Sequence, residues 1–292
     1  SDVDVFVGVG GPADSGDAVG ISIENVNVAL ALLKPTNTAD SSNYYGLRTT
    51  ADSAGFVGIE GFVLSVEDID IEVNGGTDSQ ETNRVVDFSA GDLDADGDTD
   101  GAMQVFTGPS SSIDLDFDSK LISASGKMSL IISDFVHITG NMAFSQSSGM
   151  DVTLVGGGTK TVNVLTLGAS NLNVFVGSGP YFIDSNNDGT IDENDTRSAD
   201  AVGLALDNVS FAVAIYTPDD QSDKSRYHAV SVSANSIGLV GIGSGASDVF
   251  TLTAASYRVE LNGGKDGSDT AAKPAIDFSA LPGGMHSVDI GG

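Results

Sequence analysis

The 292-residue chain contains no cysteine and no tryptophan, and its 12 Lys and Arg residues are outnumbered by 41 Asp and Glu. The absence of cysteine excludes disulfides, thiolate nucleophiles and cysteine-ligated zinc. The net charge of −29 argues against nucleic acids and anionic membrane surfaces as partners, and favours divalent cations. No apolar run approaches the roughly 20 residues of a membrane helix, so we expect no membrane insertion.

Helical signals are also missing, because no segment keeps a 3.6-residue apolar period with capping residues at its ends. Apolar and polar residues instead alternate, as in Ile69–Val73, Ile113–Phe117 and Tyr257–Leu261, with Gly, Asn and Asp between the runs. Alternation with period two is typical of half-buried strands. The hydrophobic content of 40% suffices for a core, so the sequence predicts an all-β protein.

The chain repeats itself, since Val3 to Ala90 recurs with substitutions and insertions from Leu172 to Ala280. Further matched segments are Val5–Gly8 with Val174–Gly177, Ala18–Gly20 with Ala201–Gly203, Gly55–Ile59 with Gly238–Ile242, Val73–Gly76 with Leu261–Gly264, and Asp87–Ala90 with Asp277–Ala280. Long internal repeats favour stacked modules over a single catalytic scaffold. We therefore predict elongated tandem β-repeats, either β-solenoid-like or built as stacked antiparallel sheets or a sandwich. The first repeat, with its complete strand-rich continuation, spans residues 1–168, and a second, incomplete repeat spans 169–292.

The two copies end differently. Copy one continues through a strand-rich stretch from Lys120 to Ala169, whereas copy two reaches Gly292 where its equivalent would begin. The ends therefore look complementary, and strands at one end could pair with the next molecule or the next repeat. An arbitrary fragment boundary explains the same asymmetry.

A shorter phrase recurs within the repeat: an Asp or Asn, an apolar residue, any residue, then a β-branched or aromatic residue. Its leading residues are Asp2, Asn25, Asp68, Asp114, Asp134, Asn171 and Asn208. We interpret the leading residue as the start of a strand after a turn, with a ligand role as the alternative.

Two acidic insertions have the spacing of calcium ligands. The segment 184–195 places oxygen ligands at positions 1, 3 and 5, Gly at 6, a carbonyl at 7 and carboxylates at 9 and 12, as in an EF-hand-type loop. The predicted ligands are Asp184, Asn186, Asp188, Thr190, Asp192 and Asp195. The loop departs from the pattern at position 12, where Asp replaces Glu, and no flanking helices are evident. It resembles the calcium loops of dockerins and extracellular repeat proteins, with a solvated acidic loop as the alternative.

The second insertion resembles the Asp-rich loops of thrombospondin type 3 repeats. Its predicted ligands are Asp92, Asp94, Asp96, Asp98 and Asp100. Position 12 is Met103, so the last ligand is undefined, and a solvated acidic turn is again the alternative. Because each loop is absent from the other copy, neither is needed to build the core.

Catalytic signals are weak. The three histidines, His137, His228 and His286, form no pair that indicates a base or a metal site. We expect each to be a packing or surface residue. Paired carboxylates suit glycoside hydrolysis, but in so acidic a chain their presence is uninformative. We expect no enzyme, with a polysaccharide-degrading enzyme as the least favoured alternative.

At phrases such as Phe56–Ile59, and at the strands opened by Asp or Asn, the chain resembles giant tandem-repeat extracellular proteins of bacteria, the adhesin-like class. The resemblance implies an extracellular or cell-surface location and a structural module of a surface fibre or giant adhesin. Ca2+ would be the stabilising ion, and the partners would be head-to-tail protomers or neighbouring repeats. The alternative is a domain that binds glycans or another surface, although the aromatic content of 7% disfavours it.

Overall fold

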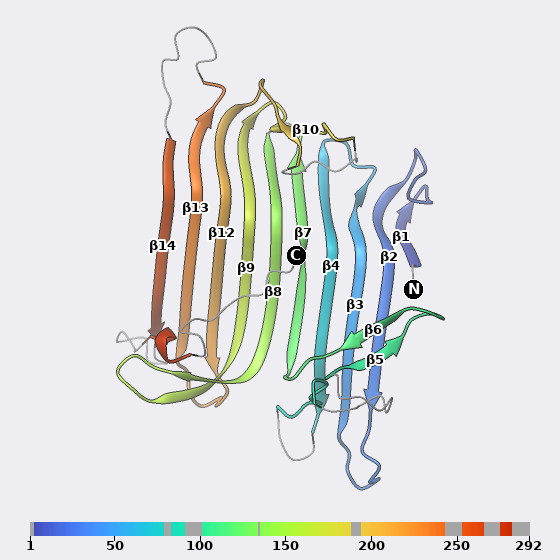
Figure 1. Ribbon diagram of the computed structural model, residues 1–292, viewed down its shortest axis with the longest axis vertical. Coiled ribbons are helices and arrows are strands. Elements are labelled where there is room, and N and C mark those ends of the chain that lie inside the picture. The colour runs from blue at the N-terminus through green and yellow to red at the C-terminus, as the bar shows by residue number, and fades with distance from the viewer. Residues whose placement is uncertain are drawn as a thin grey trace.

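The computed structural model describes residues 3–78, 83–90, 101–133, 135–187, 194–242, 253–265 and 275–281 (Figure 1). Its main feature is a single ten-stranded antiparallel sheet. The ten strands are β1 (Val3–Val9), β2 (Val19–Leu33), β3 (Asn43–Val57), β4 (Phe62–Thr77), β7 (Leu121–Ile132), β8 (Val136–Thr153), β9 (Thr159–Ser178), β12 (Val202–Pro218), β13 (Arg226–Val240) and β14 (Thr253–Lys265). Two small hairpins, β5 (Met103–Phe106) with β6 (Ser112–Leu115) and β10 (Phe182–Ile183) with β11 (Thr196–Arg197), and a 3-10 turn, η1 (Phe278–Ala280), complete it.

The ten strands follow one another across the sheet in the order in which they occur in the sequence, so the topology is a meander. This confirms the all-β prediction. The finer expectation, of tandem repeats forming a solenoid or stacked sheets, is not confirmed: the described residues form one meander, with two-stranded hairpins as the only other sheets among them. Gly168 and Ala169, at the expected boundary between repeats, lie inside β9. Within the described ranges, no helix is long and apolar enough to cross a membrane.

Left-handed residues interrupt five of the long strands. Asn25, Asp68, Asn171, Asn208 and Ser256 have φ between 50° and 59°. Asn and Asp tolerate this conformation better than other side chains, because their short polar groups bond locally. Four of these residues lead the phrase that we interpreted as a strand start. That interpretation is wrong for these four, since each lies within a continuous strand. Asp114 lies within β6, while Asp2 and Asp134 fall outside the described residues.

Each left-handed residue shifts the alternation of side chains by one position. In β2, the apolar side chains of one face belong to Val19, Ile21 and Ile23 before Asn25. After Asn25 they belong to Val26 and to every second residue that follows it. β7 contains no such residue, and its pairing with β4 shifts register by one between Glu67 and Asp70. The shift is a β-bulge, which adds one residue to one strand. It keeps the apolar residues on the same face along the whole strand.

One face of the sheet is consequently apolar across all ten strands, and we call it the open face. Residues in register share a face. One of its rows runs Val28, Thr49, Ile71, Ala124, Phe144, Leu167, Val213, Val230 and Leu261. Many of its large side chains are solvent-exposed, with Leu32 at 73% and Val9 at 69%.

The other face, the covered face, carries small and polar residues and holds three hydrophobic clusters beneath crossing segments. The first packs Phe88, Leu115 and Phe117 on Ala29 and Ala31 of β2. Figure 1 shows the β5–β6 hairpin of this cluster crossing β2 and β3. The second packs Ile276 and Leu281 on residues that include Val152, Val162, Val164, Tyr216 and Tyr227. The third packs Tyr181 and Phe182 on Phe175, Ala201 and Ala205.

Several local contacts occur twice, at positions matched in the sequence. Asn74 donates to the carbonyl of Val86 at 2.8 Å, and Asn262 donates to that of Ile276 at 2.8 Å. In the segments that follow, Asp87 and Asp277 each accept from the backbone N–H and the hydroxyl of the serine two residues on. The covering segments of the first and second clusters therefore attach to the sheet in the same way.

Paired glycines also recur where two strands approach closely. Gly8 faces Gly20 across β1 and β2, and Gly177 faces Gly203 across β9 and β12. A Cβ on Gly8 would lie 2.3 Å from the carbonyl oxygen of Val19, and one on Gly177 would lie 2.3 Å from that of Val202. Only glycine fits at either position.

The left-handed conformation of Asn208 gives a stability prediction. Asn208→Val forces a β-branched side chain to φ 50°, so we expect it to lower the free energy of unfolding by about 1–2 kcal/mol. Asn208→Gly should be nearly neutral. Ser210→Val, two residues along in regular strand geometry, is the matched control. Denaturant unfolding measures all three, and equal losses for the two valine variants would contradict the argument.

Candidate functional site

The loop predicted to bind calcium joins β10 to β11, and its two ends are held together. Phe182 pairs with Arg197 and Ile183 with Thr196. Asp195 accepts from the backbone N–H of Ser185 at 2.9 Å, and the N–H of Thr196 donates to the Ser185 hydroxyl at 3.1 Å. The first and last residues of the loop therefore lie side by side, as an ion-binding loop of this length requires.

Three of the predicted ligands of this loop fall within the described residues. Asp195 is buried, Asp184 is half-buried and Asn186 is exposed. Asp188, Thr190 and Asp192 lie outside the described residues, as do all the ligands of the second loop, Asp92, Asp94, Asp96, Asp98 and Asp100. In the described ranges, no three His, Asp or Glu residues are grouped closely enough to hold a metal ion. The calcium assignment therefore stays a prediction.

An aromatic cluster anchors this loop to the sheet. The ring of Tyr181 stacks on Phe175 at 4.7 Å, and Phe182 lies 5.4 Å from the His137 ring. The Tyr181 hydroxyl donates to Asp207 at 3.1 Å, and the same carboxylate accepts from Arg197 at 2.7 Å. The described ends of the loop are thus attached to the covered face through aromatic packing and the Asp207 carboxylate.

His137, expected to be a packing or surface residue, is buried and contacts Tyr181 and Phe182 at the start of this loop. Burial lowers the pKa of its imidazole from 6.5 to about 4, and the nearby Asp195 carboxylate only partly offsets the effect. Its Nε2 has no hydrogen-bond partner among the described residues. Burial also raises the pKa of Tyr181 to about 12. Both groups are neutral near pH 7, so neither provides an acid or base that exchanges protons there.

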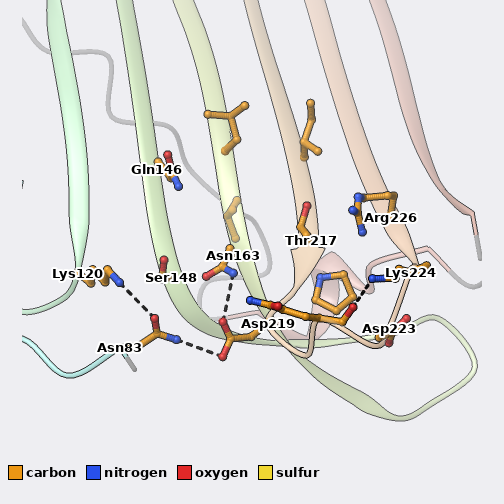
Figure 2. A pocket seen from close by; sticks show the side chains of 15 residues that line it. Asn83, Lys120, Gln146, Ser148, Asn163, Thr217, Asp219, Asp223, Lys224 and Arg226 are labelled. Atoms are coloured by element: carbon orange, nitrogen blue, oxygen red, sulfur yellow. Dashed lines mark hydrogen bonds between the residues drawn. The ribbon is translucent and has the colours of Figure 1, made fainter. Parts of the chain in front are cut away.

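A groove of about 720 Å³ lies at one end of the sheet (Figure 2). Its apolar walls include Leu165 and Ile215 of the open face, and its polar walls carry the cations of Lys120, Lys224 and Arg226. Other lining residues include Gln146, Ser148, Asn163, Thr217 and Asp219. The groove therefore offers amide, hydroxyl and cationic groups beside apolar walls.

Asp219 is the centre of a hydrogen-bond network in this groove. Figure 2 shows its carboxylate accepting from Asn83 and from Asn163, each at 3.2 Å, while Lys120 donates to Asn83 at 3.4 Å. Asn83 follows β4, whereas Asn163 belongs to β9. This network fixes polar groups from distant parts of the sequence along one wall.

Asp223 lies beside the same groove and is paired with Lys160. That contact, together with hydrogen bonds from Ser225, lowers the pKa of Asp223 to about 2. The carboxylate is therefore charged throughout the physiological range, and its pairing leaves Lys224 and Arg226 as the cations that line this part of the groove.

Carboxylates of the covered face gather around Arg48, and Asp70, Glu72 and Asp116 line a cavity of about 480 Å³ with it. Its guanidinium lies 2.7 Å from Asp70, 3.6 Å from Glu72 and 3.9 Å from Asp116. Burial and the charge of Asp70 raise the pKa of Glu72. The cluster balances acidic side chains that adjacent strands bring together.

Sequence reasoning did not find the groove. Its residues come from β8, β9, β12 and β13 and from the connections after β4, β6 and β12, so no local spacing indicates it. His228 lies within β13, and His286 lies outside the described residues.

Comparisons of the chain with protein-family models, with curated proteins and with solved structures found no match.

The buried His137 predicts a pH dependence of stability. As the pH falls from 6.5 towards 4, the unfolded chain gains a proton on this imidazole while the folded protein does not, so folding stability decreases. His137→Phe removes this contribution. We expect the variant to lose about 2 kcal/mol less than the parent protein between pH 7.5 and pH 4.5. Denaturant unfolding at both pH values measures the difference, since the carboxylates contribute equally to both proteins. Equal losses would contradict the assignment.

Proposed function

We propose that the protein is a structural module of an extracellular surface fibre or giant adhesin, stabilised by calcium and joined end to end with neighbouring modules. The observation that carries this proposal is the pair of open edges of the sheet. Among the described strands, β1 pairs only with β2, and β14 pairs only with β13. Within the described part of the chain, each outer strand therefore has one edge without a neighbouring strand, to which a further strand can bond.

The recurring features of the sheet support a modular role. Left-handed residues, paired glycines and the asparagine contacts to a covering segment all occur twice, at matched positions. A unit with the same local contacts at both ends can be extended by further units without new types of contact.

The open face supports a role within an assembly. Soluble monomers rarely expose contiguous apolar patches larger than a few hundred Å², whereas here exposed apolar side chains extend from Val7 in β1 to Val259 in β14. The covered face carries charged clusters such as that around Arg48. This separation of apolar and charged faces is expected of a module that packs against neighbouring modules in an assembly.

No enzymatic step belongs to this proposal. The described titratable groups with the largest pKa changes, His137, Tyr181 and Tyr216, are perturbed chiefly by burial, and Asp223 is perturbed by its pairing with Lys160. Perturbed groups of these kinds also arise in purely structural settings.

The alternative function is binding of a carbohydrate or another surface, and the groove favours it. Arg226, Lys224 and Lys120 would meet acidic groups of a glycan, while Asn163 and Thr217 offer hydrogen bonds. Among the described residues that line the groove there is no aromatic ring on which a sugar could stack, so we place this function second. Binding on a glycan array distinguishes it.

Calcium should raise the thermal stability of the protein. An ion that binds only the folded state adds about 2.7 kcal/mol at a concentration one hundred times its dissociation constant. We expect melting temperature to rise on adding calcium and to fall with chelator. The paired change Asp184→Asn with Asp188→Asn should abolish most of this response. Asp118→Asn, on an exposed residue outside both loops, is the charge control. If the paired substitution leaves the calcium response unchanged, calcium does not bind in this loop.

The location and role are tested on the cells that produce the protein. Antibodies raised against residues 1–292 should label intact cells, with gold particles along material that extends from the surface. The outcome that defeats the proposal is labelling confined to sectioned cell interiors, with intact cells unlabelled.

A further inference from the structure

The outer strand β14 matches β4, a strand inside the sheet. Leu261–Gly264 corresponds to Val73–Gly76 in sequence, and the left-handed Ser256 corresponds to the left-handed Asp68. β14 pairs with β13, and β4 pairs with β3, in each case without a register shift. Exposure distinguishes them, since Val259 is 57% and Leu261 is 56% exposed, whereas their equivalents Ile71 and Val73 are half-buried.

Ile71 and Val73 are less exposed because β7 pairs with the edge of β4 that β3 leaves free. Ile71 pairs with Ala124, Glu72 with Ser123 and Val73 with Ile122. The segment that leads into β7 adds a side-chain contact, because Asn74 donates to the carbonyls of both Val86 and Ser119, the latter at 3.0 Å and two residues before the strand.

Asn262, the counterpart of Asn74, makes only the first of these two contacts among the described residues, at 2.8 Å to the carbonyl of Ile276. Asn74 is 1% exposed, while Asn262 is exposed. The amide of Asn262 is thus placed to bond a residue that leads into a strand of the β7 type.

The other outer strand, β1, matches the last part of β9. Val5–Gly8 corresponds to Val174–Gly177, and both segments pair with the strand that follows them through facing glycines. The second edge of β9 is occupied by β8, where Ile138 pairs with Val174 and Val136 with Val176. The equivalent edge of β1 has no described strand.

We propose that a β7–β8-type hairpin of a neighbouring repeat bridges successive copies of this sheet, with its first strand on β14 and its second on β1 of the next copy. The matched registers place Ser123 of such a hairpin opposite Glu260, and Ala124 opposite Val259. Its Ile138 lies opposite Val5. The inference rests on the proposed end-to-end role and names its partner: the unit that extends the sheet is a hairpin, and β14 of one copy does not pair directly with β1 of another.

The chain contains no cysteine, so introduced thiols can report this register by disulfide formation. The probe is a peptide of residues 119–151, mixed with the full chain in a glutathione buffer. Glu260→Cys in the chain should link to a peptide with Ser123→Cys, and Arg258→Cys should link to one with Ser125→Cys. Directly opposed residues lie within disulfide range, about 4.5–5.5 Å between Cα atoms. The crossed combinations are two residues out of register, and we expect their yield to be lost.

Both substituted chain positions are exposed strand residues, and circular dichroism checks that the fold is retained. Equal yields for matched and crossed pairs, or no disulfide at all, would overturn the proposal. In a chain carrying both Glu260→Cys and Asp4→Cys, disulfides that join position 260 of one chain to position 4 of another, identified by mass spectrometry of the linked peptides, would overturn it as well, because they would show direct pairing of β14 with β1. The crosslinks do not depend on where the protein resides, so this result and the cell-labelling result can fail separately.

Discussion

The sheet depends on one backbone constraint: each long strand must keep its apolar side chains on one face over its whole length. A single left-handed residue, as at Asn25 in β2 or Asn208 in β12, adds one residue to the strand and shifts the alternation by one position. Without this shift, the apolar side chains of the two halves of the strand would point to opposite faces. The open face exists because these shifts are coordinated across neighbouring strands. The covered face follows from the same shifts, because they leave small residues such as Ala29 and Ala205 where the crossing segments pack.

The two faces use hydrophobic residues differently. On the covered face, large side chains are buried beneath crossing segments: Phe88 packs on small strand residues such as Ala31, and the second cluster also buries large strand residues such as Tyr216. On the open face, the large side chains belong to the strands themselves and retain much of their exposure, as Leu32 does. Carboxylates such as Asp70 are kept on the covered face and paired with Arg48. The high acidity of the chain is therefore compatible with a continuous apolar surface.

Much of this could be predicted from sequence, and the parts that could not have physical reasons. Alternation predicts strands because it is local, and spacing singled out the 184–195 loop because its ligands are close in sequence. Asn25 and Asp68 were noticed, but a shift in alternation inside one long strand looks like the start of a new strand. Alternation also does not specify which strands pair, so a meander could not be separated from a solenoid. The groove around Asp219 depends on contacts such as that with Asn83, 136 residues away, for which no local pattern exists.

The meander has a consequence for how the protein acquires its structure. Every long strand pairs with the long strands immediately before and after it in the sequence, so most backbone bonds join residues separated by a single hairpin or a short insertion. Low contact order of this kind favours fast folding. The sheet can grow strand by strand as the chain emerges from a ribosome, without waiting for its distant end. Each strand becomes the template for the next, so at every stage the most recently formed strand offers the edge at which the sheet grows.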